Sequence, residues 1–400
     1  MFWIILIGGL KMNDIYFDHA ATTPMHPEVI ETVNKYMKDY YGNPSSIYQT
    51  GQQAQNEIRK ARQEIADYIN AEDFRKIIFT SGGTESDNLA IKGIALANKN
   101  KGNHIITSKI EHHAVLHTCE YLEKYHDFNI TYIDVNEKGF ISLENIKNAV
   151  NDQTILVSIM AANNEIGSIQ PIRKIGHYLN EKEIYFHTDA VQAFGQLDID
   201  VQKMNIDLLS VSAHKVNGPK GIGLLYLKKG SKLVPQMNGG SQERNRRAGT
   251  ENLPGIMGFK KSVEILKETK EKKVKNNTYL RDKIIKGIEE NIENVLLNGP
   301  RGDKRLSNNI SFCFKNVEGE SLLLNLDMIG IASSSGSACA SGSVDPSHVL
   351  LAIGRDKNTA RGSLRLSLGI NNSEKEVNIL IDKLPDIIER IRKMSPLGEN

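Results

Sequence analysis

The sequence predicts an α/β fold with a mainly parallel central sheet. Short apolar runs rich in β-branched residues alternate with longer amphipathic stretches along most of the 400 residues. The runs predict buried strands at Lys76–Thr80, His104–Thr107, Thr154–Met160, Ile184–His187 and Asp207–Val211. Helical periodicity is clearest in Gln52–Ile69, where one face carries Ala54, Ile58, Ala61, Ile65 and Ile69. This order of elements is typical of a sheet covered by helices.

The remaining elements predict a second, smaller domain. A charged helical stretch runs from Gly255 to about Glu290, the run Asn308–Phe314 alternates like a strand with one exposed face, and a helix closes the chain from Glu374 to about Met394. We therefore expect a large domain at residues 26–266 and a small α+β domain built from residues 12–25 and 267–400. The nine-residue apolar run Phe2–Leu10 is too short to span a bilayer and lacks the features of a signal peptide, so we expect residues 1–11 to be an extension that has no role in the fold.

Composition excludes several classes of protein. Fifty basic and 48 acidic residues leave a net charge of +2, so there is no electrostatic footprint for nucleic acid or a membrane surface. The cysteines at positions 119, 313 and 339 have no metal-type spacing, and their odd number argues against a disulfide framework. A reducing compartment follows, most simply the cytoplasm. Cys119 and Cys313 lie in apolar periodic segments, where we expect core positions.

Several predicted strands end in polar or small residues, and the carboxyl ends of strands in an open α/β sheet converge on one crevice. The first tip runs from Thr80 to Asn88. Gly82 and Gly83 would let backbone N–H groups approach an anion, with Ser81 or Thr84 capping the following helix. Taken alone, the same residues also describe a plain capped turn.

Two further tips carry an acid and a lysine. Asp189 follows a buried strand, where its carboxylate needs a cationic or hydrogen-bonding partner such as a pyridinium nitrogen, and Gln192 could donate to a neighbouring phenolate. An N-cap for the next helix is an equal alternative for Asp189. Lys215 stands between a strand and a glycine-rich turn, where a lysine can lose its proton and form a Schiff base, although most loop lysines are solvated charges.

Histidine and arginine candidates complete this set. His112 opens a helix and could stack on an aromatic cofactor. His113 and His117 have a spacing that could bind a metal, but no third ligand lies nearby in sequence, so we expect no metal site. Arg365 lies on an alternating strand, either as a surface ion-pair partner or as a bidentate clamp for a carboxylate.

Cys339 lies in a run of small residues, Ala332–Ser343, that has no side chain able to bury a large apolar area. Such a run predicts a mobile loop, and a thiol on it is a reagent rather than a core residue. An anion cradle, an acid at a strand tip, a Schiff-base lysine, a stacking histidine, a carboxylate-binding arginine and this thiol together indicate a pyridoxal-phosphate enzyme.

From about Ile15 to Pro396 the chain resembles the cysteine desulfurases of the NifS/IscS type, which are fold-type I pyridoxal-phosphate enzymes of the class V aminotransferase family. The matching motifs are YFDHAATTP from Tyr16, GNPSS from Gly42, FTSGGTESDN from Phe79, NNEIG from Asn163, SAHK from Ser212, RAGT from Arg247 and SSGSAC from Ser334. Their number and order make the resemblance specific. Ala213 and Gln242 replace the family's frequent glycine and histidine, and the chain stops at Asn400 without the longer tail of housekeeping members, which leaves the acceptor open.

The resemblance implies a role for each matching residue. It implies that Lys215 forms the Schiff base with pyridoxal 5'-phosphate, that Asp189 holds the pyridine nitrogen, that Gln192 contacts the phenolate oxygen and that His112 stacks on the ring. It places the phosphate among Gly83, Thr84, Ser212 and His214, and it implies a homodimer in which Thr250 reaches the phosphate of the second subunit. Substrate-carboxylate contacts fall to Asn164 and Arg365, and the persulfide-forming nucleophile to Cys339.

The implied reaction converts L-cysteine to L-alanine and leaves the sulfur as a persulfide on Cys339. The acceptor would be an iron–sulfur scaffold or a tRNA-thiolation protein, and the sequence does not choose between them. A selenocysteine lyase or another fold-type I aminotransferase is the alternative activity, although a transaminase needs no thiol. A catalytically inactive scaffold would not need Lys215, Asp189, His112 and Cys339 together.

Overall fold

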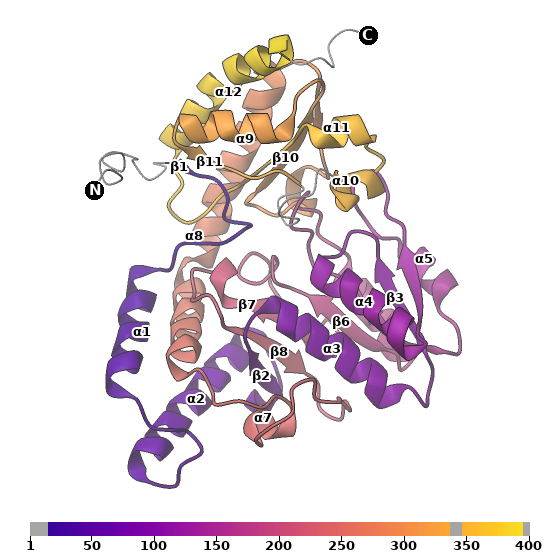
Figure 1. The fold of residues 1–400 in the computed structure, drawn as a ribbon, viewed down its shortest axis with the longest axis vertical. Helices are drawn as coiled ribbons and strands as arrows, with labels where there is room; N and C mark the ends of the chain where they lie inside the picture. Colours follow the sequence, from indigo (N-terminus) through magenta and orange to yellow (C-terminus); the bar gives the residue numbers. More distant parts are fainter. Residues whose placement is uncertain (1–14, 337–345, 395–400) are drawn as a thin grey trace, which may run out of the picture. The chain divides into compact units, whose positions relative to one another are not determined.

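The computed structural model describes residues 15–336 and 346–394. They form two compact units, which we describe separately (Figure 1). Unit 1 contains residues 15–21, 165–167 and the described residues from 272 onward, and unit 2 contains residues 22–164 and 168–271. The chain passes from unit 2 to unit 1 within the long helix α8 (Leu253–Asn291). Residues 1–11, expected to form an extension, lie outside the described residues.

Unit 2 is built on a seven-stranded sheet in the order β2-β8-β7-β6-β5-β3-β4. The pairs from β7 to β4 are parallel, whereas β8 is antiparallel to both of its neighbours. The strands are β2 (Ile77–Thr80), β3 (His104–Ser108), β4 (Asn129–Ile133), β5 (Thr154–Ser158), β6 (Tyr185–Asp189), β7 (Leu208–Ser212) and β8 (Gly223–Leu227). The predicted α/β class and its mainly parallel sheet are confirmed, and each predicted strand differs from the observed one by no more than two residues at either end.

Helices cover this sheet. They are α1 (Pro27–Asp39), α2 (Gln49–Tyr68), α3 (Gly83–Asn98), α4 (His113–His126), α5 (Leu143–Ala149), α6 (Ile172–Glu181) and the short α7 (Gln242–Asn245), with 3₁₀ turns η1 (Phe74–Lys76) and η2 (Ala213–Lys215). Helices α3 and α4 lie side by side on one face of the sheet (Figure 1). Their buried residues, including Cys119, form a core with β3, β5, β7 and β8, which confirms the core position expected for Cys119.

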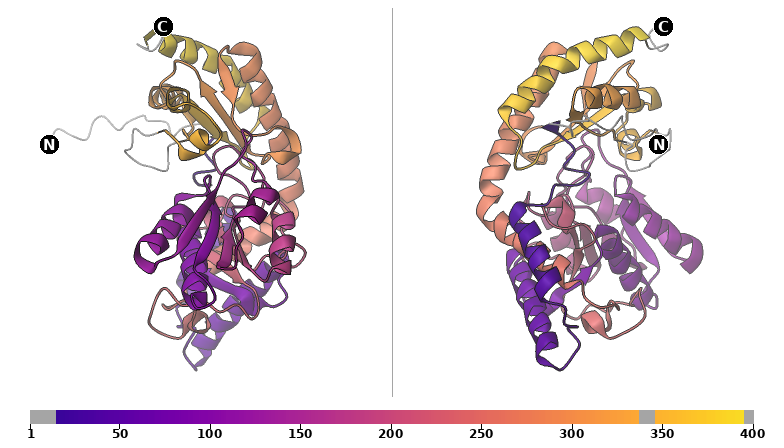
Figure 2. Two further views of the ribbon diagram at one scale, coloured as in Figure 1. Left: turned by 90° about the vertical axis from the view of Figure 1, so that its right-hand side faces the viewer. Right: turned by 60° about the vertical axis from the view of Figure 1, so that its left-hand side comes forward.

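Unit 1 contains a three-stranded antiparallel sheet in the order β12-β10-β9, together with a parallel pair of β1 and β11. The elements are β1 (Ile15–Tyr16), β9 (Val295–Leu297), η3 (Gly302–Lys304), β10 (Asn309–Phe314), α9 (Gly319–Met328), β11 (Ile331–Ala332), α10 (His348–Ala352), α11 (Lys357–Arg361), β12 (Ser363–Ser367) and α12 (Glu374–Met394). Helices α9 and α12 pack against each other in this unit (Figure 2).

The expectation of an exposed face on β10 is wrong, because all six of its residues are buried. Ile310, Phe312 and Phe314 join the apolar core of unit 1. The alternate side chains are small and polar, and they are satisfied internally: Asn298 donates from Nδ2 to Oγ of Ser311 at 3.2 Å and lies the same distance from Sγ of Cys313. An alternating pattern therefore reflects two different buried environments here rather than core and solvent.

Candidate active site

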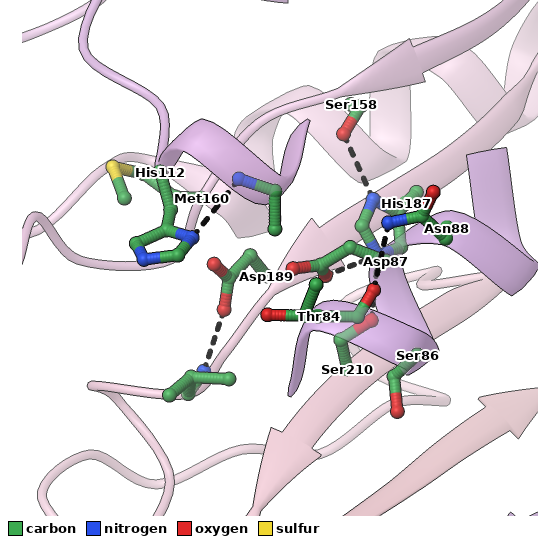
Figure 3. A network of polar contacts seen from close by, with 12 residues as sticks. Thr84, Ser86, Asp87, Asn88, His112, Ser158, Met160, His187, Asp189 and Ser210 are labelled. Atoms are coloured by element: carbon green, nitrogen blue, oxygen red, sulfur yellow. Dashed lines mark hydrogen bonds and ion pairs between the residues drawn. The ribbon is translucent and has the colours of Figure 1, made fainter. Parts of the chain in front are cut away.

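The polar ends of β5, β6 and β7 meet at one edge of the sheet in unit 2. Parallel pairing places Asp189 beside Ser210 and His187 beside Ser158. Because parallel strands end at the same edge, side chains separated by tens of residues in sequence become neighbours there. Figure 3 shows this cluster, with His112 on the same side as the Asp189 carboxyl group.

Asp189 is the last residue of β6 and is only 6% exposed. Burial raises the pKa of its carboxyl group, and two neighbours oppose that rise: the N–H of Val191, which donates to Oδ1 at 2.8 Å, and the positive charge of Lys215. A buried carboxylate held in this way presents its negative charge at the strand tip. The hydrogen bond to Val191 lies in the turn after β6, so Asp189 does not cap a regular helix, and that alternative is wrong.

His112 is the N-cap of α4, where its Nδ1 accepts a hydrogen bond from the N–H of Ala114 at 3.1 Å. Burial lowers the pKa of this imidazole to about 4, and the charge of Lys215 acts in the same direction. The ring is therefore neutral at pH 7, with Nδ1 as the acceptor. A neutral ring whose orientation is fixed by the helix N-terminus is suited to stacking on a flat cofactor.

Lys215 ends the 3₁₀ turn η2, which directly follows β7, and its side chain is half-buried. Its charge lowers the pKa of Asp189, His112 and His214, so the ammonium group is close to all three. His214 contacts Thr22 through Nδ1 at 3.1 Å, and burial lowers its pKa to about 4. The structure thus brings together an acid, a lysine and two neutral histidines, as the strand-tip argument predicted.

The N-terminus of α3 is formed by Gly82 and Gly83. The expectation that Ser81 or Thr84 caps this helix is wrong, because no side chain in the described part of the chain caps it. Instead the Glu85 carboxylate folds back to accept the N–H of Ser81 at 2.7 Å. Ser212 lies beneath the turn, 3.7 Å from where a Cβ on Gly82 would be, and a Cβ on Gly83 would come within 2.8 Å of Val191. The missing side chains leave the backbone open to an anion.

The segment from Ser241 to Thr250 is anchored to unit 2 by two ion pairs that sequence reasoning missed. Glu243 is buried and forms a two-pronged pair with Arg62, with N···O distances of 2.5 and 2.6 Å. Arg247 donates from Nε to Glu85 at 2.8 Å. These contacts hold Glu243 and its two successors at positive φ, a conformation that non-glycine residues adopt only when neighbouring contacts impose it. Thr250 is exposed at the end of this segment.

Arg365 is the candidate carboxylate-binding residue of unit 1. It is 2% exposed on β12, and its Nη2 lies 3.0 Å from Oδ1 of Asp18. The surface ion-pair interpretation is therefore wrong, since both faces of β12 are covered. Asp18 follows β1, more than 300 residues away in the sequence, and no local pattern could have identified it as the partner.

Glu165 is a buried acid of unit 1 that sequence reasoning missed. Ser347 donates to its Oε2 at 2.5 Å, and a Cβ on Gly336 would lie 3.0 Å from the same oxygen. Burial raises the pKa of Glu165 to about 7, whereas Ser347 and Arg365 oppose the rise. Asn309 fixes the backbone here by donating to the Glu165 carbonyl at 3.1 Å. The motif that begins at Asn163 thus contributes Asn164 to unit 2 and Glu165 to unit 1.

Some expected residues receive less support from the geometry. Gln192 and Asn164 are half-buried in unit 2, and Cys339 lies outside the described residues. His113 and His117 stack with ring centroids 4.9 Å apart, and residues 15–336 and 346–394 contain no group of three or more metal-ligating side chains. Within the same ranges, no helix has the length and apolar character needed to cross a membrane.

The residues present fit pyridoxal phosphate. A Cβ added at Gly83 would collide with Val191. Because this side chain is missing, the backbone of the turn at α3 is accessible beside Ser212. The buried carboxylate of Asp189 suits a protonated ring nitrogen, and Lys215 lies close enough to affect its pKa. An anion cradle, a ring-nitrogen partner and a carbonyl-binding amine are the three groups that this cofactor requires.

Comparisons with known proteins agree with this chemistry. The model of the aminotransferase class-V family matches residues 15–380. A cysteine desulfurase IscS from Clostridium botulinum is 54% identical over 389 residues, covering 97% of this chain and 98% of the relative. A solved NifS-like protein has a TM-score of 0.87 at 36% identity and covers 94% and 99% of the two chains. A structure of SspA in complex with cysteine has a TM-score of 0.77 at 40% identity, with coverage of 88% and 98%.

Proposed function

The chain belongs to the class-V aminotransferases and is a pyridoxal-phosphate-dependent cysteine desulfurase of the NifS/IscS type, and from this premise we propose how its residues divide the reaction. The observation that carries the proposal is the position of Lys215. Its positive charge lowers the pKa values of Asp189, His112 and His214 at one edge of the sheet. When bound, pyridoxal phosphate supplies the electron sink for bond changes at the α-carbon of the substrate.

Unit 2 holds the cofactor in this proposal. Asp189 would keep its negative charge toward the ring nitrogen, Gln192 would donate to the phenolate oxygen, and the neutral His112 ring would stack on the cofactor. The residues assigned to the phosphate are Gly83, Thr84, Ser212 and His214. Thr250 is exposed, which is compatible with a phosphate contact made to a second copy of the chain, and we therefore propose a homodimer.

Lys215 has two tasks. It would hold the aldehyde carbon of the cofactor, and its amine would move the proton at the α-carbon of cysteine. The surrounding histidines are neutral because their pKa values are lowered to about 4, so they do not compete for that proton at pH 7. Asn164 and Arg365 bind the carboxylate of the substrate.

Cys339 receives the sulfur. Its thiolate attacks the sulfur of the substrate, an S–S bond forms as the C–S bond breaks, and the products are L-alanine and a persulfide on Cys339. We assign residues 26–266 to the cofactor-binding domain and residues 12–25 and 267–400 to the small domain that carries Cys339, with residues 1–11 as an extension. We place the protein in the cytoplasm, because its cysteine usage suits a reducing compartment.

The persulfide would supply an acceptor protein for iron–sulfur cluster assembly or tRNA thiolation. The IscS name of the relatives favours the first route. Mass spectrometry of trapped persulfide on candidate acceptors, after incubation with labelled cysteine, would identify the recipient.

The decisive experiment substitutes Cys339→Ser and measures alanine formation together with enzyme persulfide. We expect both to be lost while the cofactor absorbance remains. Cys119→Ala is the matched control, because its thiol is buried, its pKa is raised by that burial, and its removal leaves the acceptor thiol in place. A normal desulfuration rate in the Cys339→Ser protein would reject the assignment of Cys339, and amine exchange that depends on a keto acid would favour an aminotransferase.

A further inference from the structure

Three buried carboxyl groups, rather than one, lie at the sheet edge of unit 2. Asp87 on α3 and Glu111 before α4 are each 1% exposed, and Asp189 is 6% exposed. The charge of Asp189 acts on both of the other acids. Three negative charges so close together in a dry environment repel one another strongly, so most of these groups must hold a proton.

Apart from a hydrogen bond with the Ser210 hydroxyl group, which lowers the pKa of Asp87, the contacts around this acid do not suit a carboxylate anion. Its Oδ1 has no hydrogen-bond partner in the described part of the chain and lies 3.6 Å from Nε2 of His187 (Figure 3). The Ser210 hydroxyl group hydrogen-bonds to the same carboxyl group and lies 3.0 Å from that nitrogen. Nδ1 of His187 is 2.8 Å from Oγ of Ser158. The ring therefore lies between two hydroxyl groups, with Asp87 beside its Nε2.

The other two acids are held differently. Glu111 is next to the Ser108 hydroxyl at 2.6 Å, and both of its oxygens lie 3.0 Å from the N–H of Met160. The positive charge of Lys215 lowers the pKa of Asp189. It is not among the causes of the pKa shifts of Asp87 and Glu111. The groups that face Asp87 from neighbouring elements are thus two acids, a histidine and hydroxyl groups. This arrangement concentrates the negative charge on Asp189.

We propose that Asp87 keeps its proton in the folded protein and lies as a neutral acid beside Nε2 of His187, so that Asp189 is the charged acid of the cluster. Asp87 is a positioning residue, because it acts on the ring nitrogen of the cofactor only through Asp189. The directions of the pKa shifts agree: burial raises that of Asp87, raises that of Glu111 to about 8 and lowers that of His187 to about 3.

The protonation of Asp87 belongs to the chain itself, and only its use for the cofactor rests on the proposed function. The pKa of a buried acid that stays protonated is higher in the folded state than in the unfolded state. Between these two pKa values the folded state binds more protons than the unfolded state. The stability of the wild type should then fall as pH rises through that window, and an amide at the same position should remove this dependence.

The test compares Asp87→Asn with the wild type in the cofactor-free protein by denaturant unfolding from pH 5 to pH 8. The ratio of the two unfolding constants should grow in favour of the variant by up to about tenfold per pH unit. Asp152→Asn, at an exposed acid, is the matched control and should show no such trend. Infrared difference spectra of the two proteins should also show a protonated carboxyl band that the Asp87→Asn variant lacks.

Two results would overturn the proposal. The first is an Asp87→Asn protein that fails to fold or becomes less stable than wild type as pH rises, since an amide reproduces the hydrogen-bond capacity of a neutral acid. The second is a carboxylate band in place of the protonated one.

A separate measurement on the loaded enzyme examines the link to Asp189. The pH at which the bound cofactor changes absorbance should stay constant in Asp87→Asn and move in Asp189→Asn. A shift to lower pH in Asp87→Asn would show that a negative charge had been removed, and would overturn the proposal. Failure of the protein to bind the cofactor would instead count against the proposed function and leave the result on the cofactor-free chain intact.

Discussion

The two units place their chemical groups by different means. In unit 2, Asp189, Ser212 and Lys215 lie at or just after the ends of neighbouring strands, so sheet pairing alone brings them together. In unit 1, Arg365 is paired with Asp18, and Glu165 with Ser347, through single contacts between segments separated by 347 and 182 residues. The comparison teaches that a parallel sheet makes a site recognisable from sequence, whereas isolated long-range contacts do not.

The largest effect that this comparison predicts is for Lys215→Ala in unit 2. Alanine formation should fall by about 10³-fold, because the change removes the group that we propose moves the proton at the substrate α-carbon. The pKa values of His112 and His214 should rise, since the charge of Lys215 helps to lower them; NMR titration of the cofactor-free protein would measure this. Lys220→Ala, at a nearby exposed lysine, is the matched control: it should retain activity and leave the pKa of His112 unchanged, although it also raises the pKa of His214, which the charge of Lys220 helps to lower. Unchanged histidine titrations would show that Lys215 does not lie at this sheet edge.

The same contrast explains how much could be predicted. The strands, their mainly parallel order and the residues Asp189, Lys215 and His112 follow from apolar runs that end in unusual side chains. The buried acids Asp87, Glu111 and Glu165 were missed because a single acid in a helix or loop has no local pattern, and only packing shows that it is buried. The partners of Arg365 and Arg62 were missed for a related reason, since ion pairing across a fold depends on tertiary contacts that no spacing rule encodes.

In unit 1 the next largest effect is expected for Glu165→Gln. The pKa of Glu165 is raised to about 7 in the folded protein, so the folded state binds more protons than the unfolded state between about pH 4.5 and 7. The neutral acid makes its full contribution to the stability of the wild type below that window, and this contribution is lost as pH rises through it. The glutamine variant should therefore gain stability relative to wild type, by up to about 3 kcal/mol at pH 8.

Denaturant unfolding at pH 4.5 and pH 8 would measure this difference. Glu320→Gln, at an exposed acid of α9, should show no pH-dependent gain. If Glu165→Gln loses stability at pH 8, the acid acts as a charged partner of Arg365 rather than as a neutral one. Glu165 would then join Arg365 and Asp18 in one ionic cluster, and unit 1 would differ from unit 2 in placing its charges by long-range contacts rather than by strand ends.

The smallest effect concerns Arg365→Lys, which keeps the charge of the side chain but loses the planar fork that can bind a carboxylate through two hydrogen bonds. We expect kcat/KM for L-cysteine to fall by about tenfold, mostly through a higher KM, because a hydrogen bond to a charged group contributes about 1.5–3 kcal/mol and the lysine retains one. Steady-state kinetics would measure this, with Arg361→Lys at an exposed position as the control.

Asp18 provides the sharper test, since it already occupies one side of the guanidinium at 3.0 Å. If Arg365 served only to neutralise Asp18, then adding Asp18→Asn to the lysine variant would restore KM; if it binds the substrate, KM stays high, and unit 1 contributes to recognition of cysteine through a residue whose partner no local pattern reveals.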